Sequence, residues 1–266
     1  MFWDQHMHCS FSGDSDSKPE EMINSAISKN LSGICFTDHM DFDFPEEPNI
    51  FLFDLDDYFH TLNELKEAYS HKLPIHIGVE LGLQTQVVDA NLAVAEKYPF
   101  DFIIGSSHLV NHMDPYYPEF FAGRSEDEGY SEYFETVLSN LKTNADFDVY
   151  GHIDYVVRYG PNKNKFYSYE KFKDIIDEIL HTIIQKGKGI EINTGGFKYG
   201  LGHPNPTEEI IKRYHELGGE IITFGSDAHV PEFVGYEFTR TAELAKKCGF
   251  KYYTVFENRK PEFIPL

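Results

Sequence analysis

Two pairs of polar residues with a two-residue spacing could together hold a metal ion. His6 and His8 lie in an apolar run near the amino terminus, and Asp227 and His229 lie in a second such run. Because alternate residues of a strand point to the same face, each pair would direct two ligands into one space. Imidazoles and carboxylates without a cysteine suit Zn²⁺, Fe or Mn²⁺. The two pairs therefore predict a metal site.

Four further motifs place His, Asp or Glu where a predicted strand ends. They are Thr37-Asp38-His39, Gly78-Val79-Glu80, Ser106-Ser107-His108 and Gly151-His152-Ile153-Asp154. In a parallel α/β barrel the carboxyl ends of the strands meet at one mouth, so these side chains would become neighbours. A carboxylate such as Glu80 can bridge two cations. The pattern as a whole predicts a site with more than one metal.

These motifs depend on an alternation of short apolar runs with longer segments of helical periodicity. Strands are predicted at 2–8, 33–37, 75–81, 102–107, 148–152, 189–193, 221–225 and 252–256. Helices are predicted at 19–30, 55–71, 86–97, 130–143, 169–185, 206–217 and 238–248. Repeated strand–helix units indicate parallel strands joined by crossover helices. With no glycine-rich dinucleotide fingerprint after the first strand and no linker, we expect one domain over residues 1–266, a closed or distorted α/β barrel.

The composition restricts the partners and the compartment. A net charge of −21 repels phosphate backbones and anionic lipid, so nucleic-acid and membrane partners are not expected. A small anionic substrate would need bound cations that reverse the local field. Cys9, Cys35 and Cys248 have no C-x-x-C spacing, and no apolar stretch approaches the roughly 18 residues of a membrane span. We expect a reduced, cytoplasmic protein.

The six motifs resemble those of the PHP (polymerase and histidinol phosphatase) family across nearly the whole chain, and most closely its histidinol-phosphate phosphatases. The resemblance implies a distorted seven-stranded (β/α) barrel with a trinuclear metal centre. It implies His6, His8, Glu80 and Asp227 at the first metal, Glu80, His108 and His152 at the second, and Asp14, His39 and His229 at the third. Many relatives have a histidine where Asp14 stands, and a harder, charged ligand there would alter the preferred metal.

The resemblance also implies a reaction, the hydrolysis of L-histidinol phosphate to L-histidinol and phosphate in histidine biosynthesis. A hydroxide that bridges two of three divalent metals (Zn, Fe or Mn) would attack phosphorus in line. Glu80, Asp227 and Arg158 are the expected catalytic residues, with Arg158 as a bidentate phosphate contact after His152. Lys198 is a second phosphate candidate. A surface role for Arg158 is the alternative, and the proton donor to the leaving group stays open.

The loop after the fourth strand could contact the organic half of such a substrate. Asp114, Glu119, Phe120 and Phe121 would offer carboxylates and ring faces to an ammonium and an imidazole. A solvated lid with some buried rings is the alternative. Asp38 and Asp154, which lie beside expected ligands, could orient them through hydrogen bonds or could serve only local turns.

Other functions are compatible with the same motifs. A different phosphohydrolase or phosphodiesterase of this scaffold would cleave nucleotides, sugar phosphates or phosphotyrosine. A nucleic-acid proofreading module is disfavoured by the acidic charge, and a non-catalytic metal-binding protein is disfavoured by the full ligand set. The residues determine neither the native metals nor the oligomeric state.

Overall fold

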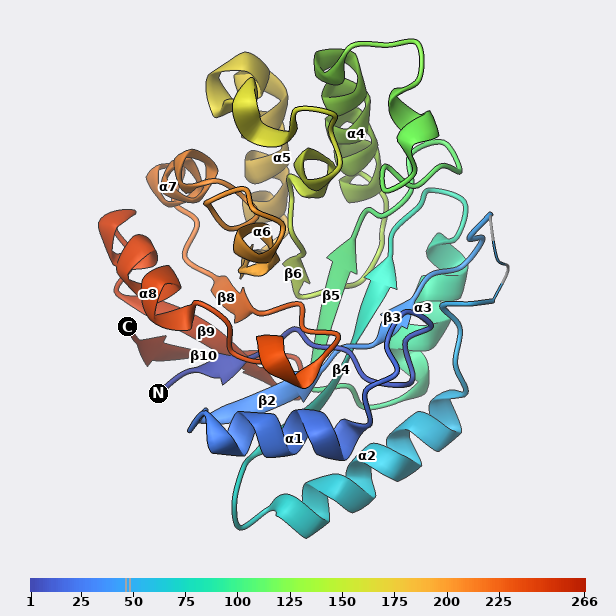
Figure 1. Cartoon of the computed structure of the whole chain (residues 1–266), viewed down its shortest axis with the longest axis vertical. Coiled ribbons are helices and arrows are strands. Elements are labelled where there is room, and N and C mark those ends of the chain that lie inside the picture. Colours follow the sequence, from blue (N-terminus) through green and yellow to red (C-terminus); the bar gives the residue numbers. More distant parts are fainter. Residues whose placement is uncertain (46, 48) are drawn as a thin grey trace.

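The computed structural model describes residues 1–45, 47 and 49–266, and its centre is a sheet of parallel strands (Figure 1). Neighbouring strands follow the order β1-β2-β4-β5-β6-β7-β8, and β3 (His39–Met40) pairs with β4. The strand bounds are β1 Trp3–Asp4, β2 Gly33–Phe36, β4 Ile75–Gly82, β5 Phe102–Ser106, β6 Val149–Tyr150, β7 Gly189–Asn193 and β8 Ile222–Gly225. All of these pairings are parallel.

The two edge strands of this sheet approach each other and nearly close it. Beyond the short β1 ladder, the Gln5 amide donates to the Phe224 carbonyl at 3.0 Å and the His8 amide donates to the Ala228 carbonyl at 2.9 Å. In return, the Asp227 amide donates to the His6 carbonyl at 2.8 Å. The predicted seven-stranded distorted barrel in one domain is confirmed in its fold class. The first strand is shorter than expected, because the described residues 5–8 keep only one backbone hydrogen bond to the segment after β2, from the Thr37 amide to the Met7 carbonyl at 2.9 Å.

Helices follow the strands, and all of them except the short α6, which lies at the mouth, cover the outside of the barrel (Figure 1). They are α1 Pro19–Ser28, α2 Leu55–Tyr69, α3 Val88–Lys97, α4 Glu126–Leu141, α5 Lys173–Gln185, α6 Gly195–Lys198, α7 Glu208–Glu216 and α8 Phe238–Lys247. The Asp54 carboxylate accepts from two amides of the first turn of α2, and Ser125 and Glu128 form a capping box at α4. No helix of the described ranges is long and apolar enough to cross a membrane.

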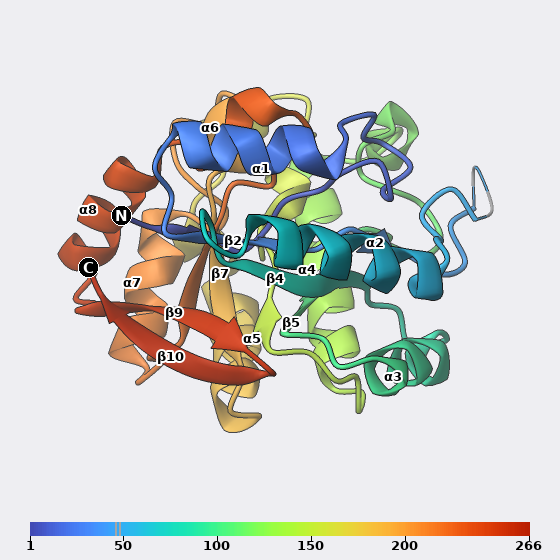
Figure 2. The same ribbon diagram turned by 90° about the horizontal axis from the view of Figure 1, so that it is seen from below.

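The last predicted strand lies outside the barrel. β9 (Tyr252–Glu257) pairs antiparallel with β10 (Lys260–Pro265), a strand that the sequence analysis missed (Figure 2). Asn258 and Arg259 form the two-residue turn with φ values of 50° and 63°, and such turns are usually marked by glycine. Arg259 Nε donates to Asp148 Oδ2 at 2.5 Å, just before β6. The hairpin therefore lies against the amino-terminal end of the barrel, opposite the carboxyl ends of the strands.

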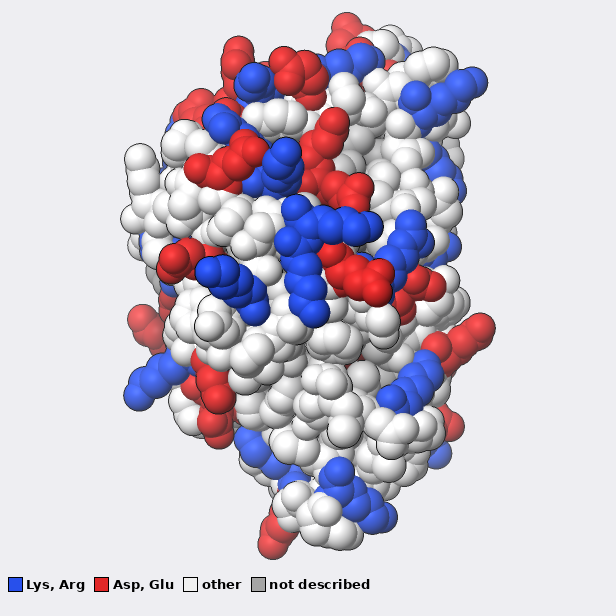
Figure 3. Space-filling model, turned by 90° about the vertical axis from the view of Figure 1, so that its left-hand side faces the viewer, with Lys and Arg blue, Asp and Glu red and all other residues white. Residues whose placement is uncertain are grey.

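The surface carries charges of both signs despite the acidic total. Figure 3 shows the side of the molecule that carries α7 and α8, where Lys and Arg side chains lie among Asp and Glu side chains. The described residues of this face therefore form no continuous basic tract of the kind that binds a nucleic-acid backbone.

Candidate metal centre

All nine expected metal ligands lie together at the carboxyl ends of the barrel strands. Glu80 lies in β4 and His39 in β3, and the others lie in the segments that follow β1, β5, β6 and β8. Most of them are buried, with Glu80 0% exposed, whereas the side chains of Asp14 and His229 are 42% and 23% exposed. The cluster thus extends from the barrel interior to the solvent. The nine are His6, His8, Asp14, His39, Glu80, His108, His152, Asp227 and His229.

Glu80 lies at the centre of this cluster and contacts imidazoles with both oxygens. Its Oε2 lies 3.2 Å from His6 Nε2 and 2.9 Å from His39 Nδ1. Its Oε1 lies 3.0 Å from His152 Nε2 and 3.3 Å from His108 Nε2. One carboxylate with two separate groups of nitrogen donors is the arrangement that a bridging ligand between two cations requires.

The donors nearest the barrel axis have the spacing of a single coordination sphere. His6 Nε2 and His8 Nε2 lie 3.1 Å apart, and His8 Nε2 lies 3.5 Å from Asp227 Oδ1. Donors about 2.0–2.1 Å from a tetrahedral Zn²⁺ lie roughly 3.3 Å from one another. These three atoms and Glu80 Oε2 therefore fit one cation.

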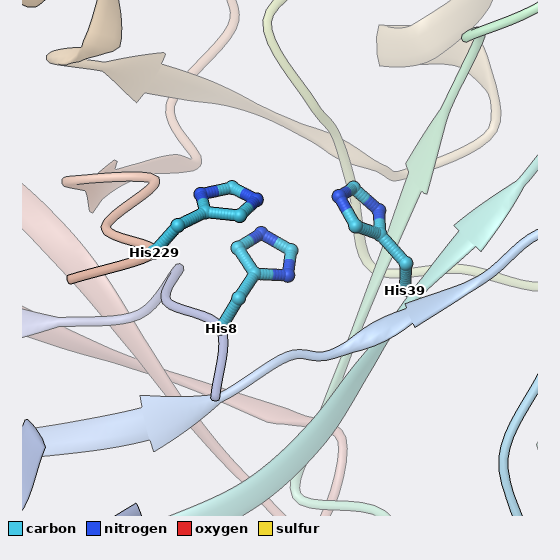
Figure 4. Close-up of side chains that lie close together, drawn as sticks. All are labelled: His8, His39 and His229. Carbon is cyan, nitrogen blue, oxygen red and sulfur yellow. The ribbon is translucent and has the colours of Figure 1, made fainter. Parts of the chain in front are cut away.

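The outer part of the cluster joins three imidazoles to Asp14. His8, His39 and His229 converge from the segment after β1, from β3 and from the loop after β8 (Figure 4). Asp14 Oδ2 lies 3.0 Å from His229 Nε2 and 3.7 Å from His39 Nε2. The ring of His8 stacks on those of His39 and His229 with centroids 4.2 and 4.1 Å apart. His8 therefore lies between the inner donors and the group that contains Asp14.

Two buried carboxylates that the sequence analysis missed contact the opposite ring nitrogens of expected ligands. Asp41 Oδ2 lies 2.9 Å from His108 Nδ1, and Glu191 Oε1 lies 2.6 Å from His6 Nδ1. A carboxylate at Nδ1 holds the proton there and leaves Nε2 free to bind a metal. Each residue did carry a signal: Asp41 repeats the two-residue spacing after His39, and Glu191 is a charge inside an apolar strand.

Asp38 orients an expected ligand indirectly, whereas the carboxylate of Asp154 has its hydrogen bonds elsewhere than at His152. Ser12 Oγ donates to Asp38 Oδ1 at 2.9 Å and lies 3.0 Å from His8 Nδ1, so it accepts the imidazole proton. Asp154 instead accepts from the side-chain amide of Asn205 at 2.6 Å.

The electrostatics of the cluster match a site that holds cations. Burial alone would raise the pKa of Glu80, but the surrounding imidazoles, first His6, hold it well below its usual range. Burial opposes protonation of His39, yet Glu80 and Asp14 raise its pKa to about 9. Burial and the neighbouring imidazoles lower the pKa of His8 well below its ordinary value. The carboxylates thus stay ionised. Their negative charge stabilises either protonated imidazoles or bound metal ions.

A pocket of about 450 Å³ opens above the cluster, a volume suited to a small molecule. Aromatic rings and acidic groups form its wall, and two cationic side chains, Arg158 and Lys198, enter it. The lining residues beyond the metal cluster are Asp41, Phe44, Glu47, Ile50, Phe51, Asp114, Tyr116, Tyr117, Tyr155, Arg158, Tyr159, Lys198 and Tyr199.

Arg158, in the 3₁₀ helix after β6, is buried and held at three atoms. Its Nη1 donates to Asp227 Oδ2 at 2.9 Å, its Nη2 to Asn193 Oδ1 at 2.8 Å and its Nε to Asn205 Oδ1 at 2.9 Å. A guanidinium has five N–H groups, so one on each Nη is left for a ligand in the pocket. Lys198 Nζ donates to the Asp227 carbonyl at 3.1 Å.

The structure corrects the expectation for the loop after β5. Glu119 is exposed and Phe121 is buried against Phe120 and Tyr130, and neither lines the pocket. The loop forms a short 3₁₀ helix at Pro118–Phe121 that turns these side chains toward solvent and toward α4. Of the four residues expected there, Asp114 is the one that reaches the pocket wall.

Fold and site together define a metal-binding α/β barrel enzyme. The PHP domain family model matches residues 4–195, and the chain therefore belongs to the PHP domain family. It is similar to a probable histidinol-phosphatase of Clostridium acetobutylicum, with 36% identity over 94% of this chain and 95% of that protein. It is also similar to a histidinol-phosphatase of Lactococcus lactis, with 32% identity over 97% and 95% of the two chains.

Two solved structures resemble this one over most of both chains. The first is a histidinol phosphate phosphatase of Lactococcus lactis in complex with zinc, L-histidinol and phosphate, with a TM-score of 0.90, 32% identity and 98% of each chain covered. The second is a putative histidinol phosphatase of Listeria monocytogenes, with a TM-score of 0.79, 21% identity and 90% and 99% of the two chains covered. The second likeness shows the shared fold.

Proposed function

We propose that this protein is a metal-dependent phosphatase that hydrolyses L-histidinol phosphate to L-histidinol and phosphate, a step in histidine biosynthesis. The observation that carries the proposal is the likeness to the Lactococcus lactis enzyme, which holds zinc, L-histidinol and phosphate and aligns with 98% of this chain. The cluster of expected metal ligands at the carboxyl ends of the strands supports the proposal, because phosphomonoester hydrolysis requires strong neutralisation of charge.

The proposed cofactors are three divalent ions of Zn, Fe or Mn. His6, His8, Glu80 and Asp227 would hold the first ion, Glu80, His108 and His152 would hold the second, and Asp14, His39 and His229 would hold the third. Bound metals would supply Lewis acidity that neutralises the phosphoryl oxygens and lowers the pKa of an attacking water. The spacing of the donors around Glu80 and around Asp14 supports this division.

Arg158 is the proposed phosphate contact, and Lys198 is a weaker second one. The two free N–H groups of Arg158 sit on separate nitrogens, which suits two oxygens of one phosphoryl group. Asp227 beside it raises the pKa of Arg158 against the effect of burial, so its charge is permanent. Arg158 therefore orients the phosphoryl group and stabilises the charge that develops in the transition state.

The organic half of the substrate is proposed to lie against Asp114 and the tyrosines of the pocket. Asp114 accepts from the Tyr116 amide at 2.8 Å and from Tyr155 Oη at 3.3 Å, and both bonds involve Oδ1. Oδ2 is then available to the substrate ammonium, and the ring faces are available to its imidazole.

Elemental analysis of purified protein coupled to a phosphate-release assay tests the proposal. We expect about three metals per chain and a preference for L-histidinol phosphate over nucleotides, sugar phosphates and phosphotyrosine. Equal or better turnover of another ester would contradict the proposed substrate but would still support phosphatase activity. Metal-replete protein that is inactive on every ester would overturn the function.

A further inference from the structure

β7 supplies none of the nine expected ligands, yet it carries two buried polar residues on the face that meets the site. Glu191 and Asn193 are both 0% exposed, and Ile192 between them belongs to the hydrophobic core. A buried carboxylate in a central strand is costly unless its partners compensate. The partners of these two side chains therefore indicate what they do.

Glu191 binds one expected metal ligand and the backbone of another. Its Oε1 lies 2.6 Å from His6 Nδ1, and its Oε2 accepts from the His152 amide at 3.0 Å. Because an ionised carboxylate can only accept, Nδ1 of His6 carries a proton toward Glu191, and Nε2, which faces Glu80 and His8, is the nitrogen left to bind a metal. Glu191 thus orients His6 so that this nitrogen faces the cluster.

The neighbouring strand leaves room for this carboxylate. A Cβ atom on Gly225 in β8 would overlap Glu191 Oε1 and come within 2.5 Å of the His6 Cβ. Any larger residue at Gly225 would push the two side chains apart. The position of the Glu191 carboxylate over β8 and beside His6 therefore depends on glycine at residue 225.

Asn193 forms hydrogen bonds with both Glu191 and Arg158 and thereby couples the orientations of their side chains. Its Nδ2 donates to Glu191 Oε2 at 3.0 Å and to Asp227 Oδ2 at 3.3 Å. With the amide nitrogen directed at two carboxylates, Oδ1 must face the opposite way, where it accepts from Arg158 Nη2 at 2.8 Å and from the Gly195 amide at 2.9 Å. The acceptor that holds Arg158 is thereby determined.

We propose that Glu191 and Asn193 are positioning residues that couple His6 to Arg158, so that metal binding at the first position and phosphate binding support each other through β7. The inference rests on the proposed function, because it takes His6 as a metal ligand and Arg158 as a phosphate contact. By this inference β7, which supplies none of the expected metal ligands, also contributes to the site.

Glu191→Gln tests the first half of this bridge. Glutamine keeps the volume of the side chain, but its NH₂ group must face either His6 Nδ1 or the N–H donors of His152 and Asn193. In each orientation a donor replaces an acceptor, so hydrogen bonds are lost. We expect zinc binding to weaken about 10–100-fold in competition with a chromophoric chelator, as when the outer partner of a ligand histidine is lost. Binding of inorganic phosphate to the zinc-saturated protein, measured by titration calorimetry, should weaken as well.

Asn193→Ala tests the second half. With zinc saturating, we expect the dissociation constant of inorganic phosphate, measured by titration calorimetry, to rise about tenfold, the effect of losing a hydrogen bond to a charged group. In an Arg158→Lys background, neither Asn193→Ala nor Glu191→Gln should weaken phosphate binding by its full separate factor, because both act through the guanidinium.

Ile192→Val is the matched control on the opposite face of the same strand. It should lower the thermal unfolding temperature and leave the affinities for zinc and for inorganic phosphate unchanged. If Glu191→Gln and Asn193→Ala behave like Ile192→Val in both binding measurements, the bridge is refuted. Both readouts are independent of turnover, so wild-type protein that binds zinc and phosphate without hydrolysing L-histidinol phosphate would overturn the proposed function alone.

Discussion

Asp41 Oδ2 lies 2.9 Å from His108 Nδ1, while Nε2 of the same ring lies 3.3 Å from Glu80. The carboxylate holds the proton on the nitrogen that faces away from Glu80, so the other nitrogen is free for a metal. Space for Asp41 depends on Gly82, where a Cβ atom would overlap its carboxylate.

Replacement of Asp41 should therefore weaken metal binding without removing a ligand. We expect Asp41→Ala to lower the affinity for Zn²⁺ about 10–100-fold and Asp41→Asn, which can still accept a hydrogen bond, to have a smaller effect. Metal retained after dialysis against a graded chelator measures this. Asp43→Asn, at an exposed carboxylate two residues away, is the control, and equal metal retention in Asp41→Ala and Asp43→Asn would contradict the role of Asp41.

Replacement of Asp14 tests whether the protein binds a third metal ion. Asp14→Asn replaces the carboxylate that lies 3.0 Å from His229 Nε2, and an amide is a much poorer ligand. We expect the variant to lose one of the three proposed ions and to fall at least about tenfold in activity. Elemental analysis should show full metal content in Asp16→Asn, an exposed acid of the same loop. Unchanged metal content in Asp14→Asn would contradict the third metal site at Asp14 and would remain compatible with the other two.

Arg158 should be irreplaceable by lysine. Lysine keeps the charge but lacks the planar fork, and a point charge cannot satisfy Asp227, Asn193 and Asn205 together. We expect Arg158→Lys to lower kcat/KM for L-histidinol phosphate about 10²–10³-fold. Arg240→Lys, at an exposed arginine, is the matched control. Steady-state kinetics that match the control would exclude Arg158 from phosphate binding.

Asp114 should govern the choice of substrate and add a pH dependence. Burial raises its pKa to about 6, so the carboxylate is neutral below that pH and charged above it. We expect kcat/KM for the cationic L-histidinol phosphate to rise with pH through about 6, and this rise to vanish in Asp114→Asn.

The same variant should lose about 10–100-fold on L-histidinol phosphate and little on p-nitrophenyl phosphate, which carries no ammonium. Glu119→Gln serves as the control, because that side chain lies outside the pocket. Parallel losses on both esters in Asp114→Asn would place Asp114 in general catalysis instead of recognition of the ammonium.

Metal binding itself should release protons. The pKa of His39 is raised to about 9 without metal, because Glu80 and Asp14 outweigh burial, and a ligand imidazole must be neutral. Metal affinity should therefore increase as the pH rises toward about 9. Titration calorimetry in buffers of different ionisation enthalpy measures the released protons. A proton count near zero at pH 7 would show that His39 is already neutral there.

The barrel, and the meeting of polar side chains at its mouth, were predictable because both depend on local pattern, whereas the division of these side chains among three metals came from the family resemblance. Glu80 lies in β4, His6 and Asp227 each follow a strand by two residues, and the carboxyl ends of parallel strands must meet at one mouth. Runs of the right length and alternation with helical segments limit the arrangement of the chain to few topologies. The antiparallel hairpin at the other end was missed because Asn258 and Arg259 adopt left-handed φ values without a glycine to signal the turn.

The tertiary structure alone decided which groups orient the ligands and which face the pocket. Glu191 is a charge inside an apolar strand, but its partners and those of Asn193 are decided only when β6, β7 and β8 pack side by side. Arg158 likewise gains its three partners from separate segments of the barrel. Glu119 and Asp114 share a loop, yet backbone geometry sends one to solvent and the other to the pocket. Such contacts join residues far apart in the chain, so sequence spacing carries no record of them.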